Sequence, residues 1–138
     1  MTDRERQLFL LRRFGFGASY EDQKLLQPSW TRLLEVLLAE PKDPDAFVPY
    51  PFLKRDNGEA ATRIQGMRDW WLAEMVCSPH VLRERMTIFW HDHFAVDLRN
   101  LSPQALMIQH VIALRKDPLG RFEDLLKGMT RDPAFMKF

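Results

Sequence analysis

Residues 78–94 read SPHVLRERMTIFWHDHF, and this stretch decides the fold. It opens on a serine and a proline, a pair that caps a helix and starts its first turn. Apolar side chains then recur every three or four positions, as they do on one face of a helix. This inward stripe consists of Leu82, Met86, Phe89 and His93. The stretch therefore predicts a helix from Pro79 through Phe94.

The same start signal occurs at two further points. Ser102-Pro103 and Asp132-Pro133 each place a capping side chain before a proline, which predicts a helix start. Apolar spacing predicts further helices over residues 3–14, after Ser19, from Pro28-Ser29 and over 59–76, the last with Trp71 in the core. No alternating strand pattern of useful length occurs. We expect an all-α fold, an irregular multi-helix domain of about six to seven helices spanning residues 1–138.

Residues 41–58 interrupt the helical pattern. They combine Asp43 and Asp45 with four prolines, a composition that prevents a regular helix. The prolines are Pro41, Pro44, Pro49 and Pro51. We expect a long Pro-rich loop at the surface.

The helix predicted at Pro133 has barely begun where the sequence stops at Phe138. A helix of one or two turns is not stable alone. We therefore expect either that these residues are the front of a longer protein, or that Pro133–Phe138 dock on a protein partner or a missing C-terminal segment.

Composition narrows the classes of partner and location. The formal net charge is +1, so no long-range field would attract nucleic acid or an anionic membrane. No apolar run approaches the roughly 20 residues of a membrane span, and charges at residues 3–6 break the start where a signal peptide needs an apolar segment. We expect no nucleic-acid partner, no membrane span and a cytoplasmic location. We expect the single cysteine, Cys77, to be a small core residue.

The two histidines of the 78–94 stretch are its chemically specific residues. Imidazoles serve as metal ligands and proton carriers. On a continuous helix His91 and His93 lie about 200° apart, so both bind one metal only if the helix ends near His91. The interpretation we favour makes His93 a hydrogen-bonded core residue and His91 a surface residue.

His110 supports an alternative interpretation. It lies on the inward stripe of the next predicted helix, and two inward histidines on consecutive helices can meet. His91 or His93, His110 and the carboxylate of Asp97 would then bind a divalent transition metal and activate water. The catalytic candidates are His91, His93 and Asp97, and the metal-ligand candidates add His110.

A second polar constellation lies at residues 12–19. Gly15 follows the first predicted helix, where we expect a left-handed helix stop. Arg12 and Arg13 precede it, and Ser19 begins the next predicted helix, whose backbone N–H groups could bind an anion. The sequence matches no phosphate-loop pattern. We therefore favour a helix stop with salt-bridged arginines over an anion site formed by Arg12, Arg13 and Ser19.

Three blocks of the sequence carry a family resemblance. They read LLRRFGFGAS (10–19), LRERMTIFWHDHF (82–94), and FEDLL with TRDPA (122–126 and 130–134). In order and spacing they resemble the front part of a large bacterial family catalogued as domain of unknown function 1800. The resemblance implies a longer protein, frequent export and no established general activity. The chain differs in having Asp92 where asparagine is common, and we expect no export signal at its start.

Two classes of function remain open. The favoured one for the isolated chain is a helical interaction or structural module, whose aromatic and histidine residues hold the core. The alternative is a metal-dependent or acid/base, hydrolase-like enzyme with a site around His91 and His93. Histidines that converge on one point would favour the enzyme.

Overall fold

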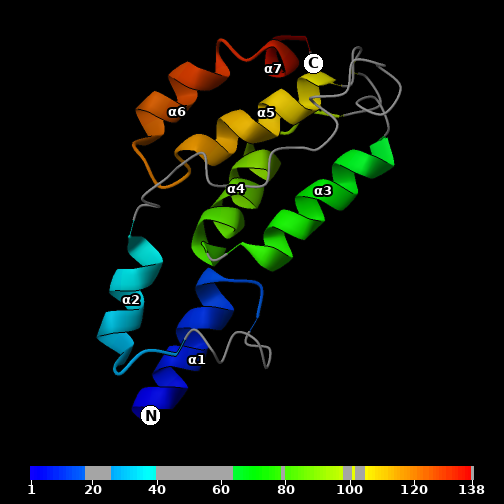
Figure 1. Ribbon diagram of the computed structural model, residues 1–138. Coiled ribbons are helices and arrows are strands. Elements are labelled where there is room, and N and C mark those ends of the chain that lie inside the picture. The colour runs from blue at the N-terminus through cyan, green and yellow to red at the C-terminus, as the bar shows by residue number, and fades with distance from the viewer. Residues whose placement is uncertain (18–25, 40–63, 79, 98–100, 102–104, 138) are drawn as a thin grey trace.

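The computed structural model describes residues 1–17, 26–39, 64–78, 80–97, 101 and 105–137. Within these ranges all regular secondary structure is helical (Figure 1), which confirms the all-α fold. The helices are α1 (Asp3–Phe14), α2 (Trp30–Leu38), α3 (Ile64–Cys77), α4 (Val81–His93), α5 (Ala105–Lys116), α6 (Phe122–Met129) and α7 (Pro133–Lys137). No helix in the described ranges has both the length and the apolar character needed to cross a bilayer.

Several predictions concern residues outside the described ranges. They are the helix after Ser19, the Pro-rich loop over 41–58, the start of the 59–76 helix and the start signal at Ser102-Pro103.

Capping side chains begin α2 and α7 as predicted. Ser29 Oγ accepts a hydrogen bond from the backbone N–H of Arg32 at 3.2 Å. Asp132 Oδ1 accepts one from the backbone N–H of Phe135 at 2.8 Å. Each bond satisfies a donor that the first turn of a helix leaves unpaired.

The start of α4 differs from the prediction by two residues. The helix begins at Val81, not at Pro79. The hydroxyl of Ser78 accepts a hydrogen bond from the backbone N–H of His80 at 3.2 Å, two residues along the chain. Such a short turn precedes the helix instead of capping it.

Both ends of α1 lie where the sequence predicts them, but its stop has another conformation. At the start, Glu5 N donates to Thr2 Oγ1 and Thr2 N donates to Glu5 Oε2, which forms a capping box. At the end, Gly15 has φ −119° and ψ −158°, so the expected left-handed stop is wrong and the backbone is extended. Glycine is needed there because a Cβ atom would lie 2.8 Å from the backbone oxygen of Leu11.

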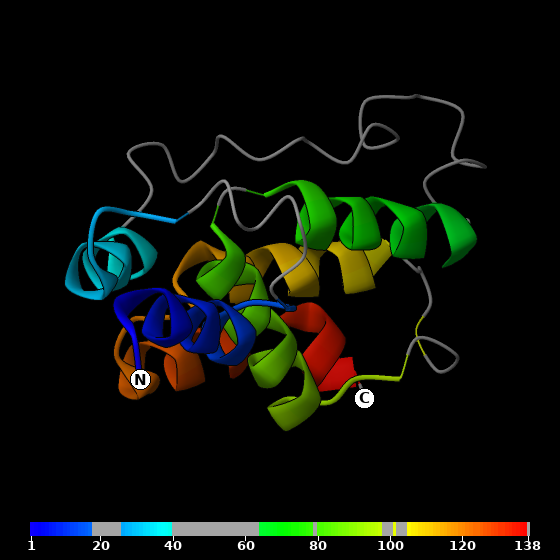
Figure 2. The same cartoon turned by 90° about the horizontal axis from the view of Figure 1, so that it is seen from below.

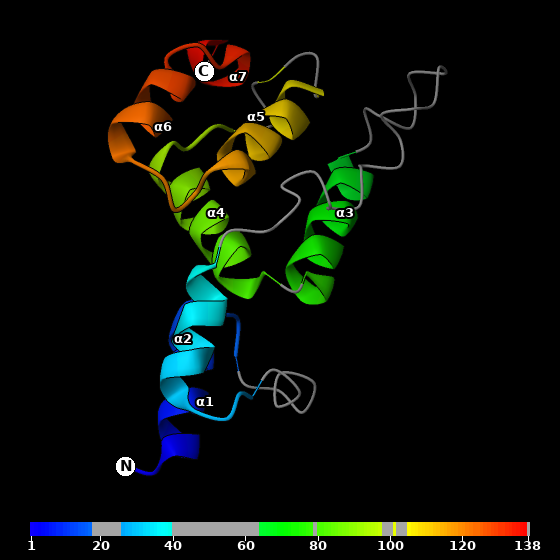
Figure 3. The same cartoon turned by 60° about the vertical axis from the view of Figure 1, so that its left-hand side comes forward.

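The pair of α1 and α2 lies at one end of the molecule, and α6 and α7 lie at the other (Figures 1 and 3). Gln7 of α1 is buried and joins the pair. Its amide donates to the backbone oxygen of Gln27 at 2.9 Å and accepts from the Gln27 N–H at 2.8 Å. Asp3 Oδ1 accepts from the Trp30 N–H at 3.2 Å, so hydrogen bonds fix the start of α2 against α1.

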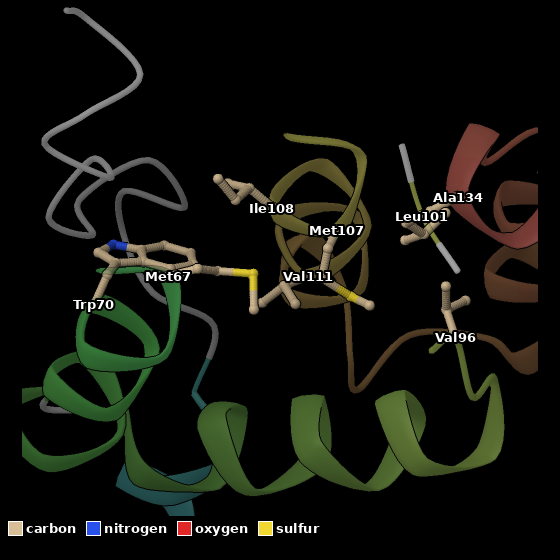
Figure 4. Close-up of a cluster of buried hydrophobic side chains, with 8 residues drawn as sticks. All are labelled: Met67, Trp70, Val96, Leu101, Met107, Ile108, Val111 and Ala134. Carbon is tan, nitrogen blue, oxygen red and sulfur yellow. The ribbon is translucent and has the colours of Figure 1, made fainter. Parts of the chain in front are cut away.

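The helices α3, α4 and α7 pack around α5. It runs beside α3 (Figure 2) and packs against α4 and α7. Met67 and Trp70 of α3 lie on one side of α5, and Val96, Leu101 and Ala134 lie on the other (Figure 4). Its buried side chains point in several directions and are Met107, Ile108, His110, Val111, Leu114 and Arg115. A helix buried on so much of its circumference is central to the core.

A buried ionic network joins α3, α4 and α5, and we call it the Arg115 network. The guanidinium of Arg115 donates to both carboxylate oxygens of Glu84, at 3.0 and 2.5 Å. It also donates to Glu74 Oε2 at 2.9 Å. Arg83 Nε donates to the backbone oxygen of Arg115 at 2.7 Å. All four side chains are buried, so the charges must be paired and well hydrogen-bonded to offset their desolvation.

The Arg115 network turns the polar side of α4 inward. Glu84 and Thr87 are fully buried, whereas Phe89 is 54% exposed and His93 is exposed. The predicted inward stripe is therefore wrong in its second half. Burial of α4 follows the charged partner on α5 more closely than the apolar spacing of its own sequence.

The expected core role of Cys77 is also wrong. Met67, Trp70 and Glu74 form the buried face of α3. Cys77 continues this face at the last residue of the helix, where it reaches solvent. Val76 beside it is exposed as well.

Arg115→Ala tests how much the Arg115 network contributes to the stability of the fold. The change would leave two buried carboxylates without their cation, so we expect the free energy of unfolding to fall by about 3–5 kcal/mol in urea titrations. The matched control is Arg121→Ala, which removes an exposed arginine paired with Glu123 at 3.2 Å. That pair should contribute less than about 1 kcal/mol. Equal losses in the two variants would contradict a structural role for the network.

Candidate acid/base site at His110

The last turn of α4 and the middle of α5 bring two imidazoles together. His91 is half-buried, His110 is fully buried, and their ring centroids lie 5.7 Å apart. His91 follows Glu84 and Thr87 at helical spacing, so the network that buries Glu84 also turns His91 toward α5.

His93 lies on the other side of α4 and is exposed. Its ring lies 4.9 to 6.4 Å, between centroids, from those of Phe89, Trp90, Phe94 and Phe122. The expectation of a core His93 and a surface His91 is therefore wrong, and the structure reverses it. Because the two residues lie about 200° apart on one helix, only one of them can face α5.

A carboxylate holds the ring of His110. His110 Nδ1 lies 3.0 Å from Asp132 Oδ1, and both side chains are buried. The same oxygen accepts the backbone N–H of Phe135. A carboxylate only accepts hydrogen bonds, so Nδ1 is the donor and Nε2 of the neutral ring is an acceptor. Nε2 is buried and has no hydrogen-bond partner within the described ranges.

Trp71 of α3 borders the same place. Its ring centroid lies 4.9 Å from that of His91 in an edge-on arrangement. Its Nε1 is also buried, again with no hydrogen-bond partner among the residues described. One donor and one acceptor, neither with a partner in the described part of the chain, thus belong to rings that both contact His91.

The environment of His91 keeps it neutral. Its pKa is lowered from 6.5 to about 4. Burial is the largest cause, repulsion from His110 adds to it, and the carboxylate of Asp92 acts in the opposite direction. At pH 7 the two imidazoles therefore do not carry positive charge together.

Only some of the predicted metal ligands lie close together. His91 and His110 are neighbours, whereas His93 faces away. Asp97 is half-buried after the end of α4. Across the described part of the chain, no three histidine, cysteine, aspartate or glutamate residues are arranged to hold a metal ion. The metal site formed by His91, His93, His110 and Asp97 stays a prediction.

The anion site also stays a prediction. Arg12 and Arg13 are exposed in the last turn of α1. Ser19 lies outside the described residues. Gly17, between them, has φ +155°, a value that side chains rarely adopt.

Sequence reasoning missed two members of the site. The sequence predicts Asp132 only as a helix cap, although a carboxylate can accept further hydrogen bonds while it caps. Trp71 packs against the core as the sequence predicts, but nothing in the spacing of its neighbours indicates that its indole N–H lacks a partner among the described residues. The inward position of His110 on α5 is the signal that the sequence offers, because a buried imidazole needs a hydrogen-bond partner.

The sequence of this chain matches one known protein family. A family model described as "Protein of unknown function (DUF1800)" matches residues 9–138. The chain belongs to this family. The resemblance seen in the sequence is thereby confirmed. The site residues of this DUF1800 protein all lie within the matched range, and they are Trp71, His91, His110 and Asp132. No curated protein and no solved structure gives a significant match.

The lowered pKa of His91 makes stability depend on pH. The unfolded chain protonates this imidazole near pH 6.5 and the folded protein only near pH 4, so the unfolded state binds more protons between these values. The stability that neutral His91 contributes is complete above about pH 6.5 and is lost as the pH falls toward 4. Urea midpoints at pH 7, 5.5 and 4.5 measure this loss. We expect His91→Gln to flatten it and the exposed control His93→Gln to keep the wild-type dependence; an unchanged slope in His91→Gln would refute the assignment.

Proposed function

We propose that this DUF1800 protein performs acid/base catalysis at His110, with Asp132 and His91 as its partners. The observation that supports this most is the state of His110. Its ring is buried and oriented by a carboxylate, and its Nε2 has no partner among the described residues. A buried polar atom left unpaired costs about 1–3 kcal/mol. A site that uses this nitrogen accounts for that cost, whereas core packing does not.

Each residue has a separate role in the proposal. Asp132 holds the imidazole in one orientation and stabilises the imidazolium that forms when Nε2 takes a proton. The Phe135 N–H, bonded to the same oxygen, holds the carboxylate in place. His91, neutral at pH 7, adds no opposing charge beside that imidazolium. The enzyme alternative thus moves from His91 and His93 to His91 and His110.

A helical interaction module is the second candidate, and one observation favours it. Phe89, His93 and Phe122 form a contiguous exposed group, which we call the aromatic surface. Phe89 is 54% and Phe122 is 50% exposed, and Leu126 follows on the next turn of α6. Exposed aromatic rings gathered in one place are typical of protein-binding surfaces.

Variants of His110 and Asp132 test the acid/base proposal. On a panel of chromogenic esters, phosphate esters and glycosides, we expect His110→Gln to reduce kcat on any substrate that is turned over by about 10²–10⁴-fold. Asp132→Asn should also reduce it, because the amide orients the ring but does not stabilise its charge. His93→Gln is the control and should retain activity.

Nuclear magnetic resonance of the imidazole nitrogens gives an independent test. When the His110 imidazole is neutral, we expect its proton on Nδ1 and its lone pair on Nε2. A proton on Nε2, or an activity that survives in His110→Gln, would rule the proposal out.

The aromatic surface can be tested by sedimentation velocity at increasing protein concentration. We expect concentration-dependent self-association that Phe89→Ser weakens, because the change removes exposed apolar area. Val76→Ser removes an apolar side chain that is also exposed, at the end of α3, and should have no effect. Equal behaviour of the two variants would speak against the module.

A further inference from the structure

We infer that the site binds a hydroxyl group, from water or from an alcohol, between His110 Nε2 and Trp71 Nε1. The inference rests on the proposed function and adds to it the group whose proton His110 takes. It depends on two buried polar atoms of opposite hydrogen-bonding character, which belong to two rings that contact one imidazole.

Trp71 provides the donor. Its ring packs edge-on against His91 at 4.9 Å, so the indole lies beside the site. Nε1 is buried and, as far as the described residues extend, has no acceptor. An indole nitrogen can only donate a hydrogen bond. Any group that satisfies it must therefore present a lone pair.

His110 provides the acceptor. Its ring contacts the same imidazole at 5.7 Å, and its Nε2 is buried without a donor among the residues described. The bond from Nδ1 to Asp132 leaves the lone pair of the neutral ring on Nε2. Any group that satisfies this atom must present a proton.

A hydroxyl meets both demands at once, since it has one O–H donor and two acceptor lone pairs. A carboxylate offers no proton to Nε2, and an ammonium group offers no lone pair to the indole. A metal ion would satisfy Nε2, but the positive end of the Trp71 N–H would repel it. The pair of atoms thus favours a hydroxyl over the metal predicted from the sequence.

The proton transfer in this arrangement is balanced. The hydroxyl proton moves to His110 Nε2, and the imidazolium that forms is stabilised by the carboxylate of Asp132. The oxygen keeps the electron pair of the broken O–H bond, as hydroxide or alkoxide, and retains the hydrogen bond from Trp71 Nε1. The transfer itself needs no further reactant.

The experiment observes the indole N–H groups of the ¹⁵N-labelled full chain by nuclear magnetic resonance. The chain has four tryptophans, so each indole can be followed separately. If water is the ligand, the Trp71 N–H shows cross-relaxation with a long-lived water, and this signal persists when ethanol is added as a probe. If an alcohol is the ligand, the Trp71 signal shifts with ethanol and saturates, while the signal of Trp30, on α2, does not move. Neither cross-relaxation nor a saturable shift would overturn the inference.

Trp71→Phe keeps a ring and removes only the N–H, and it separates the inference from the proposed function. Loss of the bridging hydroxyl should move the His110 Nε2 resonance toward that of an imidazole nitrogen without a hydrogen bond. The control Trp30→Phe should leave it unchanged. If the resonance does not move in Trp71→Phe and the proton remains on Nδ1, the inference fails and acid/base catalysis by His110 stands. If the neutral ring of His110 carries its proton on Nε2, both fail.

Discussion

The bidentate ion pair between Arg115 and Glu84 determines which side of α4 faces α5. Helix α4 has two possible inward sides, an apolar stripe that ends in His93 and a polar stripe that ends in His91. Burying Glu84 beside the guanidinium selects the polar stripe, because a carboxylate turned into an apolar core without its cation would be far more costly. The choice of histidine at the site therefore follows from a contact made two turns earlier on the same helix.

The position of Arg115 on α5 extends this constraint to two other parts of the molecule. Through Glu74 it holds α3, which also contributes Trp71. Through α5 itself it is linked to His110, little more than one turn away. Site residues on three helices are thus positioned by one network that none of them joins directly.

Local signals in the sequence predict where most of the described helices lie. Capping residues and apolar spacing give both ends of α1 and the starts of α2 and α7, because these features depend on neighbours within a few residues. The orientation of α4 could not be predicted in this way. Arg115 lies 31 residues from Glu84 and 41 from Glu74, and no periodicity reports such a pairing. The site likewise combines local and long-range features. The apolar spacing of its own helix predicts the inward position of His110. Asp132 and Trp71 join the site only through packing between helices that are distant in the sequence.

Asp132 Oδ1 accepts hydrogen bonds from both the imidazole of His110 and the first turn of α7. This double use restricts the substitutions that evolution can accept at the position. Asparagine would preserve the cap but lose the negative charge that stabilises a protonated ring, and glutamate would preserve the charge but is a poor cap because its chain is longer. Serine would cap the helix without any charge at all. Only aspartate meets both requirements, so residue 132 should tolerate less sequence drift among relatives than a helix cap alone would need.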